Sequence, residues 1–133
     1  MELERIDHIC IAVKNLEQAV EQYVKAFQLK QIDAYVDESE KINVVRFKIG
    51  EVAFELMEST TEDGEVAKFI KRRGEGVFLI SFKVPNVVES MKELADKGMP
   101  VMDKTPRRWR SSDFTFVNPR EYNGVLIELI DEQ

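Results

Sequence analysis

The stretch DHICIAVKNLEQAVEQY (residues 7–23) sets the architecture of the chain, because FLISFKVPNVVESMKEL (residues 78–94) repeats its pattern. Each copy reads as an apolar strand, a short break and an amphipathic helix with one apolar face. Asn15 and Asn86 stand at equivalent positions in the break, where an amide oxygen can cap the first turn of a helix. The chain therefore predicts two copies of one supersecondary unit.

The ends of the two copies also match. VAFELM (residues 52–57) and VLIELI (residues 125–130) are apolar strands, each with one central glutamate. We expect two further strands within each copy, near 31–37 and 42–49 in the first and near 100–102 and 113–117 in the second. The predicted fold class is α+β, with two βαβββ modules whose sheet and helices lie in layers.

The length of 133 residues predicts a single domain, residues 1–133, with a core of its own. We expect module one over about 3–60 and module two over about 76–132. The segment GEVAKFIKRR predicts a linking helix over about 64–73, with a glycine directly after it.

Composition restricts the partners. The net charge of −6 disfavours nucleic acid, and no apolar run is long enough to span a membrane. The N-terminal residues MELERIDH carry acids where a signal peptide is basic and then apolar. Cys10 is the single cysteine, which excludes an internal disulfide and a zinc site of several thiolates. We expect a cytoplasmic protein that binds a small molecule.

Strand periodicity places four residues on one sheet face. His8 is the single histidine, and alternation puts it opposite the face that packs under the helix. The same alternation puts Glu55 and Glu128 on the face away from the core, and the repeat equivalent of His8 is Leu79. A pseudo-twofold arrangement of the modules would bring all four residues onto one face.

A neutral imidazole and two carboxylates suit a divalent metal ion such as Co, Mn, Ni or Zn. Water would complete the coordination shell. The alternative is structural: a lone histidine is usually a satisfied core residue, and a glutamate in mid-strand usually faces solvent. Both interpretations stay open at this point.

Three stretches resemble the vicinal oxygen chelate superfamily, which includes glyoxalases, bleomycin resistance proteins and dioxygenases. They are IDHICIAVKNLEQAVEQY (6–23), FELMESTTEDGEVAKFIKRRGEG (54–76) and NPREYNGVLIELID (118–131). Within the superfamily, the chain looks most like the methylmalonyl-CoA epimerases. The resemblance implies two βαβββ modules forming a cupped mixed sheet around a divalent metal, and a homodimer.

Carried over position by position, the resemblance implies that His8, Glu55 and Glu128 are metal ligands. Glu128 and Glu55 are also the candidate catalytic groups, since a carboxylate in such enzymes takes a proton from the carbon beside a carbonyl. The implied activity is that of an isomerase: proton abstraction beside a thioester carbonyl, with a metal-stabilised enolate and an acyl-CoA as the substrate.

The chain departs from the family pattern in three places. In GEGVFLISF (74–82), Leu79 replaces the family's second metal histidine, and a leucine cannot coordinate. Some epimerases have a catalytic glutamate in the third strand, but residues 43–46 contain no carboxylate. Asn118 replaces a histidine in the segment before the last strand.

These departures leave two alternatives to a divergent epimerase. One is a small-molecule binding protein on the same fold with a degraded metal site, which the apolar Leu79 favours. The other is a glyoxalase-like lyase, which uses similar enolate chemistry. An extradiol dioxygenase needs two histidines and a carboxylate to bind Fe(II). This chain has one histidine and lacks the second ligand, which nearly excludes that class.

The segment KTPRRWR (104–110) is the one locally basic region. Arg108 and Arg110 are candidates to hold a carboxylate or CoA phosphates, and Trp109 is a candidate to stack on a flat ring. Leu79 is the corresponding apolar contact for a substrate. The alternative is a solvated loop whose charges offset the acidic balance of the chain.

Overall fold

The computed structural model describes residues 1–132 as two compact units. The first unit comprises residues 8–78; the second comprises residues 1–7 and the chain from Leu79 onward. Among the described residues, no helix is both long and apolar enough to cross a membrane.

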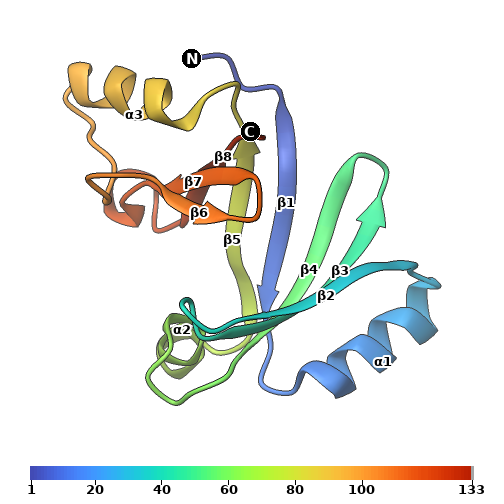
Figure 1. The fold of residues 1–133 in the computed structure, drawn as a ribbon. Coiled ribbons are helices and arrows are strands. Elements are labelled where there is room, and N and C mark those ends of the chain that lie inside the picture. Colours follow the sequence, from blue (N-terminus) through green and yellow to red (C-terminus); the bar gives the residue numbers. More distant parts are fainter. Residues whose placement is uncertain (133) are drawn as a thin grey trace. The chain divides into compact units, whose positions relative to one another are not determined.

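The first unit contains one α-helix packed on strands, followed by a second helix (Figure 1). Its elements are β1 (Arg5–Ala12, whose first three residues belong to the second unit), α1 (Leu16–Phe27), β2 (Gln31–Asp37), β3 (Ile42–Ile49), β4 (Val52–Ser59) and α2 (Glu65–Arg73). The strand order is β2-β3-β4-β1. Strand β1 pairs with β4 in parallel, while β2, β3 and β4 pair in antiparallel fashion.

The second unit repeats this arrangement. Its elements are β5 (Gly76–Lys83, which begins in the first unit), α3 (Val87–Asp96), β6 (Arg107–Trp109), β7 (Ser112–Phe116), a 3-10 turn (Pro119–Glu121) and β8 (Ile127–Ile130). The strand order is β5-β8-β7-β6, with β5 and β8 parallel and the other pairs antiparallel. Each of the four strands thus has the neighbours of its counterpart in the first unit.

The helices begin where the sequence predicts. The side chain of Asn15 accepts a hydrogen bond from the Gln18 N–H at 2.9 Å, and Asn86 accepts one from the Glu89 N–H at 2.9 Å. Gly98, directly after the turn that ends α3, has φ +75°, a conformation that glycine adopts without steric cost. The capping residues therefore set the helix bounds locally.

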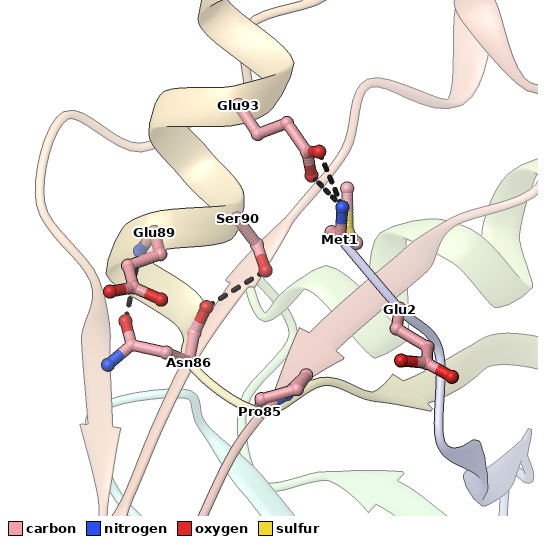
Figure 2. A pocket seen from close by; sticks show the side chains of 7 residues that line it. All are labelled: Met1, Glu2, Pro85, Asn86, Glu89, Ser90 and Glu93. Atoms are coloured by element: carbon pink, nitrogen blue, oxygen red, sulfur yellow. Dashed lines mark hydrogen bonds and ion pairs between the residues drawn. The ribbon is translucent and has the colours of Figure 1, made fainter.

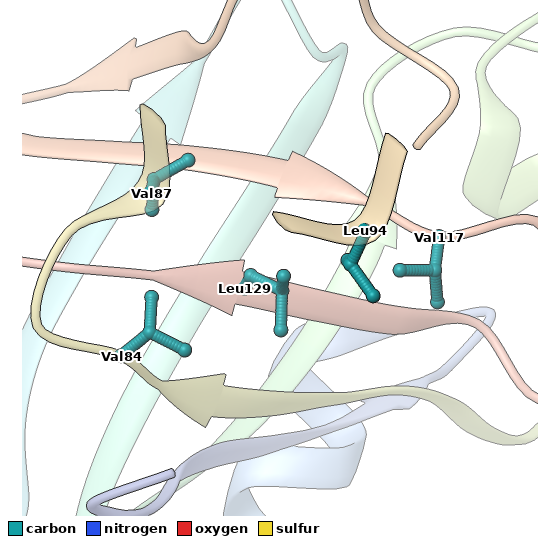
Figure 3. Packing of buried hydrophobic residues seen from close by; sticks show 5 residues of the cluster. All are labelled: Val84, Val87, Leu94, Val117 and Leu129. Carbon is teal, nitrogen blue, oxygen red and sulfur yellow. The ribbon is translucent and has the colours of Figure 1, made fainter. Parts of the chain in front are cut away.

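Each unit has its own apolar core. In the first, the face of β3 and β4 that includes Phe47 and Leu56 packs against α1 through Leu16. In the second, a cluster joins residues of α3 to residues of β8 and of the segments that directly follow β5 and β7 (Figure 3). Its buried members are Val84, Val87, Leu94, Val117 and Leu129.

The predicted α+β class and the two βαβββ modules are confirmed. The strands predicted near 31–37 and 42–49 and the linking helix near 64–73 match β2, β3 and α2 closely. The strand predicted near 100–102 is wrong: the structure has β6 at Arg107–Trp109, inside the basic segment. The prediction followed apolar residues, whereas β6 is a short edge strand that begins with two arginines and is held to β7 by its backbone. The single-domain prediction stays a prediction.

Candidate active site

His8 and Glu55 lie close together in the first unit. His8 is on β1, Glu55 is on the neighbouring β4, and the two strands are in parallel register. The His8 Nε2 atom is 4.0 Å from Glu55 Oε1. Both residues are buried, with relative exposures of 7% for His8 and 3% for Glu55. A buried carboxylate requires compensating partners, so the surroundings of Glu55 decide what this pair can do.

Arg46 supplies the compensating charge. Its Nε donates to Glu55 Oε2 at 2.7 Å. In the antiparallel register of β3 and β4, Arg46 lies directly opposite Glu55, so the backbone places both side chains on one face. The three residues form a polar group that we call the His8–Glu55–Arg46 cluster.

Sulfur atoms line the neighbouring part of the same face. Cys10 is fully buried, and its Sγ lies 3.6 Å from the Sδ of Met57, which is also buried. These soft, apolar atoms keep the surroundings of Glu55 poor in water. Cys10 therefore fills space beside the cluster.

Glu128 lies in the second unit, on β8, and is 6% exposed. Its Oε1 accepts a hydrogen bond from Ser81 Oγ at 2.7 Å, across the parallel pair of β5 and β8. Leu79, two residues before Ser81 on β5, is also buried and apolar. Ser81 and Leu79 thus give the second unit a polar and an apolar group on one strand face.

The structure therefore divides the predicted site residues between the two units. His8 and Glu55 come together in one unit, whereas Glu128 and Leu79 belong to the other. Within residues 1–132, no group of three His, Cys, Asp or Glu side chains is arranged to hold a metal ion. The convergence of Glu128 with His8 and Glu55 stays a prediction.

The predicted substrate-binding arginines lie on the β6–β7 hairpin of the second unit. Arg108 donates to Asp113 Oδ1 at 2.8 Å, so its guanidinium already holds a carboxylate. The Arg110 guanidinium lies 4.5 Å from the centroid of the Trp109 ring, a cation–π contact. A bound anion would share these guanidinium groups with the contacts they make here.

A pocket of about 300 Å³ lies elsewhere in the second unit, between the N-terminus and α3 (Figure 2). It is lined by Met1, Glu2, Pro85, Asn86, Glu89, Ser90 and Glu93. The N-terminal ammonium of Met1 is hydrogen-bonded to the Glu93 carboxylate, which lowers the pKa of Glu93. None of the predicted site residues lines this pocket, so it is separate from the candidate active site.

Comparison with known proteins identifies the family of the chain. The family model of the Glyoxalase/Bleomycin resistance protein/Dioxygenase superfamily matches residues 7–116. The chain belongs to this superfamily.

Relatives match along nearly the whole chain. An uncharacterized Bacillus subtilis protein, YqjC, is 34% identical over 97% of this chain and 93% of its own length. The Cereibacter sphaeroides ethylmalonyl-CoA/methylmalonyl-CoA epimerase is 25% identical over 94% of this chain and 96% of its own. A Streptomyces coelicolor methylmalonyl-CoA epimerase variant, solved in complex with 2-nitronate-propionyl-CoA, is 34% identical. It has a TM-score of 0.93 and covers 98% of this chain and 96% of that one.

The superfamily's divalent metal fits this chain's residues poorly. One Glu55 oxygen is taken by Arg46, whose positive charge would lie directly beside a metal cation bound to the same carboxylate. Leu79 occupies the position where the resemblance implies a histidine ligand, and it has no donor atom. In the first unit, the donors that remain are His8 and a Glu55 that is already paired with Arg46. This set has less negative charge and fewer donors than a typical divalent site.

Sequence reasoning missed Arg46 and Ser81. The signal for Arg46 was its position in strand 42–49, because β3 pairs with β4 and places it beside Glu55. The signal for Ser81 was the two-residue period, since it follows Leu79 on the same face. Asn118, at the position of a family histidine, caps the 3-10 turn by accepting from the Arg120 N–H at 3.0 Å.

Proposed function

We propose that this chain is an enzyme of the epimerase type, which inverts the carbon beside the carbonyl of a small acyl-CoA thioester. The observation that carries the proposal is whole-length similarity to epimerases, including the S. coelicolor structure with its acyl-CoA analogue. Two buried carboxylates, Glu55 in the first unit and Glu128 in the second, support it. Buried carboxylates are suited to proton transfer, because their environment can tune them to the reaction.

The reaction has two proton transfers. A carboxylate removes the proton from the carbon beside the thioester carbonyl, and the electron pair of the broken C–H bond forms an enolate. A proton then returns to the same carbon from the opposite face, which inverts the centre. Glu128 and Glu55 are the proposed acid–base groups. Ser81, which donates to Glu128, orients that carboxylate.

The proposed substrate contacts lie in the second unit. Leu79 provides an apolar wall for the acyl group, and Arg108 and Arg110 attract the phosphates of CoA. Trp109 offers a flat ring for stacking. The proposal also includes a homodimer, which light scattering would detect as twice the mass of one chain.

The test is deuterium exchange. Methylmalonyl-CoA is incubated with the protein in D₂O, and loss of the proton at C2 is followed by NMR. Glu128→Gln should slow exchange by about 10²-fold or more, the usual contribution of a general acid–base group. Glu62→Gln, which removes an exposed carboxylate, is the control and should exchange at the wild-type rate.

The second candidate is a binding protein on the same fold. It is favoured by the buried Leu79 and by the Arg46–Glu55 ion pair, which together make the site less charged. Tight binding of an acyl-CoA without exchange above the protein-free rate would support this candidate and contradict the epimerase proposal.

A further inference from the structure

We infer that the Arg46 guanidinium, rather than a divalent metal ion, is the resident positive charge of the His8–Glu55–Arg46 cluster. The assignment of the charge stands on the geometry of the cluster alone. Its use to stabilise an enolate rests on the proposed function. The two parts are tested by separate measurements.

The pairing of Arg46 with Glu55 follows from the backbone. Eight successive residue pairs join β3 and β4 in one antiparallel register, from Ile42 opposite Ser59 to Ile49 opposite Val52. Arg46 and Glu55 are directly opposite in that register, and side chains at such positions share one face of the sheet. No change of register or loop movement is needed for the two groups to meet.

The pair is largely shielded from water, and its cation carries a permanent charge. The side chain of Glu55 is 4% exposed and that of Arg46 is 17% exposed, with 2.7 Å between Nε and Oε2. Arginine stays protonated throughout the range in which proteins are folded. Such a cation, directly beside a carboxylate with so little access to water, favours the charged form of that carboxylate.

A divalent metal would have to compete with this cation. An ion bound to Glu55 would either displace Arg46, which leaves a half-buried guanidinium without its carboxylate, or accept a positive charge a few ångströms away. His8 lies on the other side of the carboxylate, 4.0 Å from Oε1. The repeat position of His8 is Leu79, so the second unit offers no imidazole in exchange.

A guanidinium can perform the electrostatic part of the chemistry. It carries five N–H donors in a planar fork, so one arginine can hold a carboxylate and also donate to a second anion. Negative charge that develops on a thioester oxygen during proton abstraction is such an anion. Arg46 would then stabilise the enolate oxygen, and its hydrogen bond to Glu55 would hold both side chains in place during proton transfer.

The first experiment measures metal binding without any activity. Co(II) is titrated by calorimetry into metal-free wild type, Arg46→Met and Lys48→Met. Lys48 is exposed and lies two residues along the same strand, so its replacement removes a charge from the same face and serves as the matched control. We expect Arg46→Met to bind Co(II) at least about tenfold more tightly than wild type, which corresponds to about 1.4 kcal/mol. Lys48→Met should match wild type.

Two results would overturn the inference. One is stoichiometric binding of Co(II) or Mn(II) by wild type with a Kd below about 10 μM. The other is an affinity in Arg46→Met that is no higher than in wild type, with circular dichroism showing that the variant is folded. If Arg46→Met does not fold, the wild-type titration still tests the inference, because tight metal binding by wild type would overturn it. Arg46→Lys then tests whether a retained positive charge prevents metal binding.

The second experiment separates the inference from the proposed function. Deuterium exchange at C2 of methylmalonyl-CoA is measured with wild type treated with EDTA, and again after Co(II) is added. Exchange that persists in EDTA and falls in Arg46→Met supports both proposals. Exchange only with added metal overturns the role of Arg46 but leaves the epimerase proposal intact. If exchange is absent in both conditions, the epimerase proposal is contradicted. The calorimetric result still tests the assignment of the charge to Arg46.

Discussion

At the residue scale, buried carboxylates are held by partners on the neighbouring strand. Glu55 is held by Arg46 on β3, and Glu128 is held by Ser81 on β5. In both cases the partner lies directly opposite in the strand register. The ionic partner favours the charged form of Glu55, whereas the neutral hydroxyl orients Glu128 without adding a charge beside it.

Removal of the Ser81 hydroxyl should destabilise the protein. Ser81→Ala takes a hydrogen bond from a buried carboxylate, and we expect the free energy of unfolding to fall by about 2 kcal/mol in urea denaturation. Ser90→Ala is the matched control, because Ser90 is also buried but donates to the backbone carbonyl of Asn86, the residue that caps its own helix. A loss in Ser81→Ala no larger than in Ser90→Ala would contradict the assigned role.

Asp63 should titrate at unusually low pH. The Thr61 hydroxyl donates to its carboxylate at 2.6 Å and the Lys41 ammonium lies 2.9 Å away, which together lower the pKa of Asp63 from 3.8 to about 2. A lowered pKa contributes stability that is complete above pH 3.8 and is lost as the pH falls through about 2. NMR titration of the side-chain carboxyl carbons measures this value directly.

The Thr61 hydroxyl is the largest cause of the Asp63 shift. Thr61→Val should therefore move the pKa of Asp63 upward, toward its ordinary value, while Lys41 still holds it below that value. A pKa that does not change in Thr61→Val would show that Lys41 alone is responsible.

At the element scale, each of the two repeated helices has a second cap, from an acid at the end of β4 or directly after β8. The Leu16 N–H at the start of α1 donates to Glu58 Oε1 at 2.8 Å. The Val87 N–H at the start of α3 donates to Asp131 Oδ2 at 2.7 Å. Glu58 and Asp131 stand at the same place after VAFELM and VLIELI, so the repeat includes an acid that complements the positive end of a helix.

Asp131 should contribute more than Glu58 to the free energy of unfolding. It is 1% exposed, and its other oxygen accepts from the Asp113 N–H at 3.0 Å. Asp131→Ala leaves two backbone N–H groups without their acceptor, and we expect a loss of about 3 kcal/mol in the free energy of unfolding. Glu58→Ala, at a half-buried position, should lose about 1 kcal/mol.

Asp131→Asn keeps one carbonyl acceptor and should fall between wild type and Asp131→Ala. Thermal unfolding followed by circular dichroism ranks the variants. Glu58 also accepts two hydrogen bonds, from the Leu16 N–H and the Asn43 amide, so equal losses in Asp131→Ala and Glu58→Ala would show that the deeper burial of Asp131 has no special weight.

At the scale of the whole molecule, two units each contain an apolar core. Leu56 is fully buried in the first core and Leu129 is 3% exposed in the second. Each core is closed by one helix of the repeat, α1 or α3. The sequence predicts that the two cores nevertheless belong to one domain. A single domain usually unfolds in one cooperative transition, so the prediction can be tested by unfolding.

Paired core variants test the single-domain prediction. Leu56→Ala and Leu129→Ala should each lower the free energy of unfolding by about 3 kcal/mol, through lost burial and the cavity left behind. If the units form one domain, each variant shifts one common transition, seen by both calorimetry and circular dichroism. Leu3→Ala, at a half-exposed position, is the control and should have little effect. A transition that splits in either core variant would show two independent domains.

Much of the fold was predictable because its signals are local. The period of apolar residues, the caps Asn15 and Asn86, and the glycines after the helices act within a few residues of one another. The exception was β6, a three-residue edge strand whose pairing with β7 depends on the backbone and leaves no apolar pattern. The two-residue period likewise placed His8 and Glu55 on the face away from the helix core.

The sequence by itself determined the two modules, the residues that face away from each core and the absence of a second histidine. The partners of those residues were decided only by the tertiary structure. Arg46 meets Glu55, and Ser81 meets Glu128, because strands that are distant in sequence pair in one register. Register is a property of two strands together, and a single residue's neighbours along the chain do not contain it. That physical fact gives Glu55, a predicted ligand, an arginine partner that its own stretch of sequence does not contain.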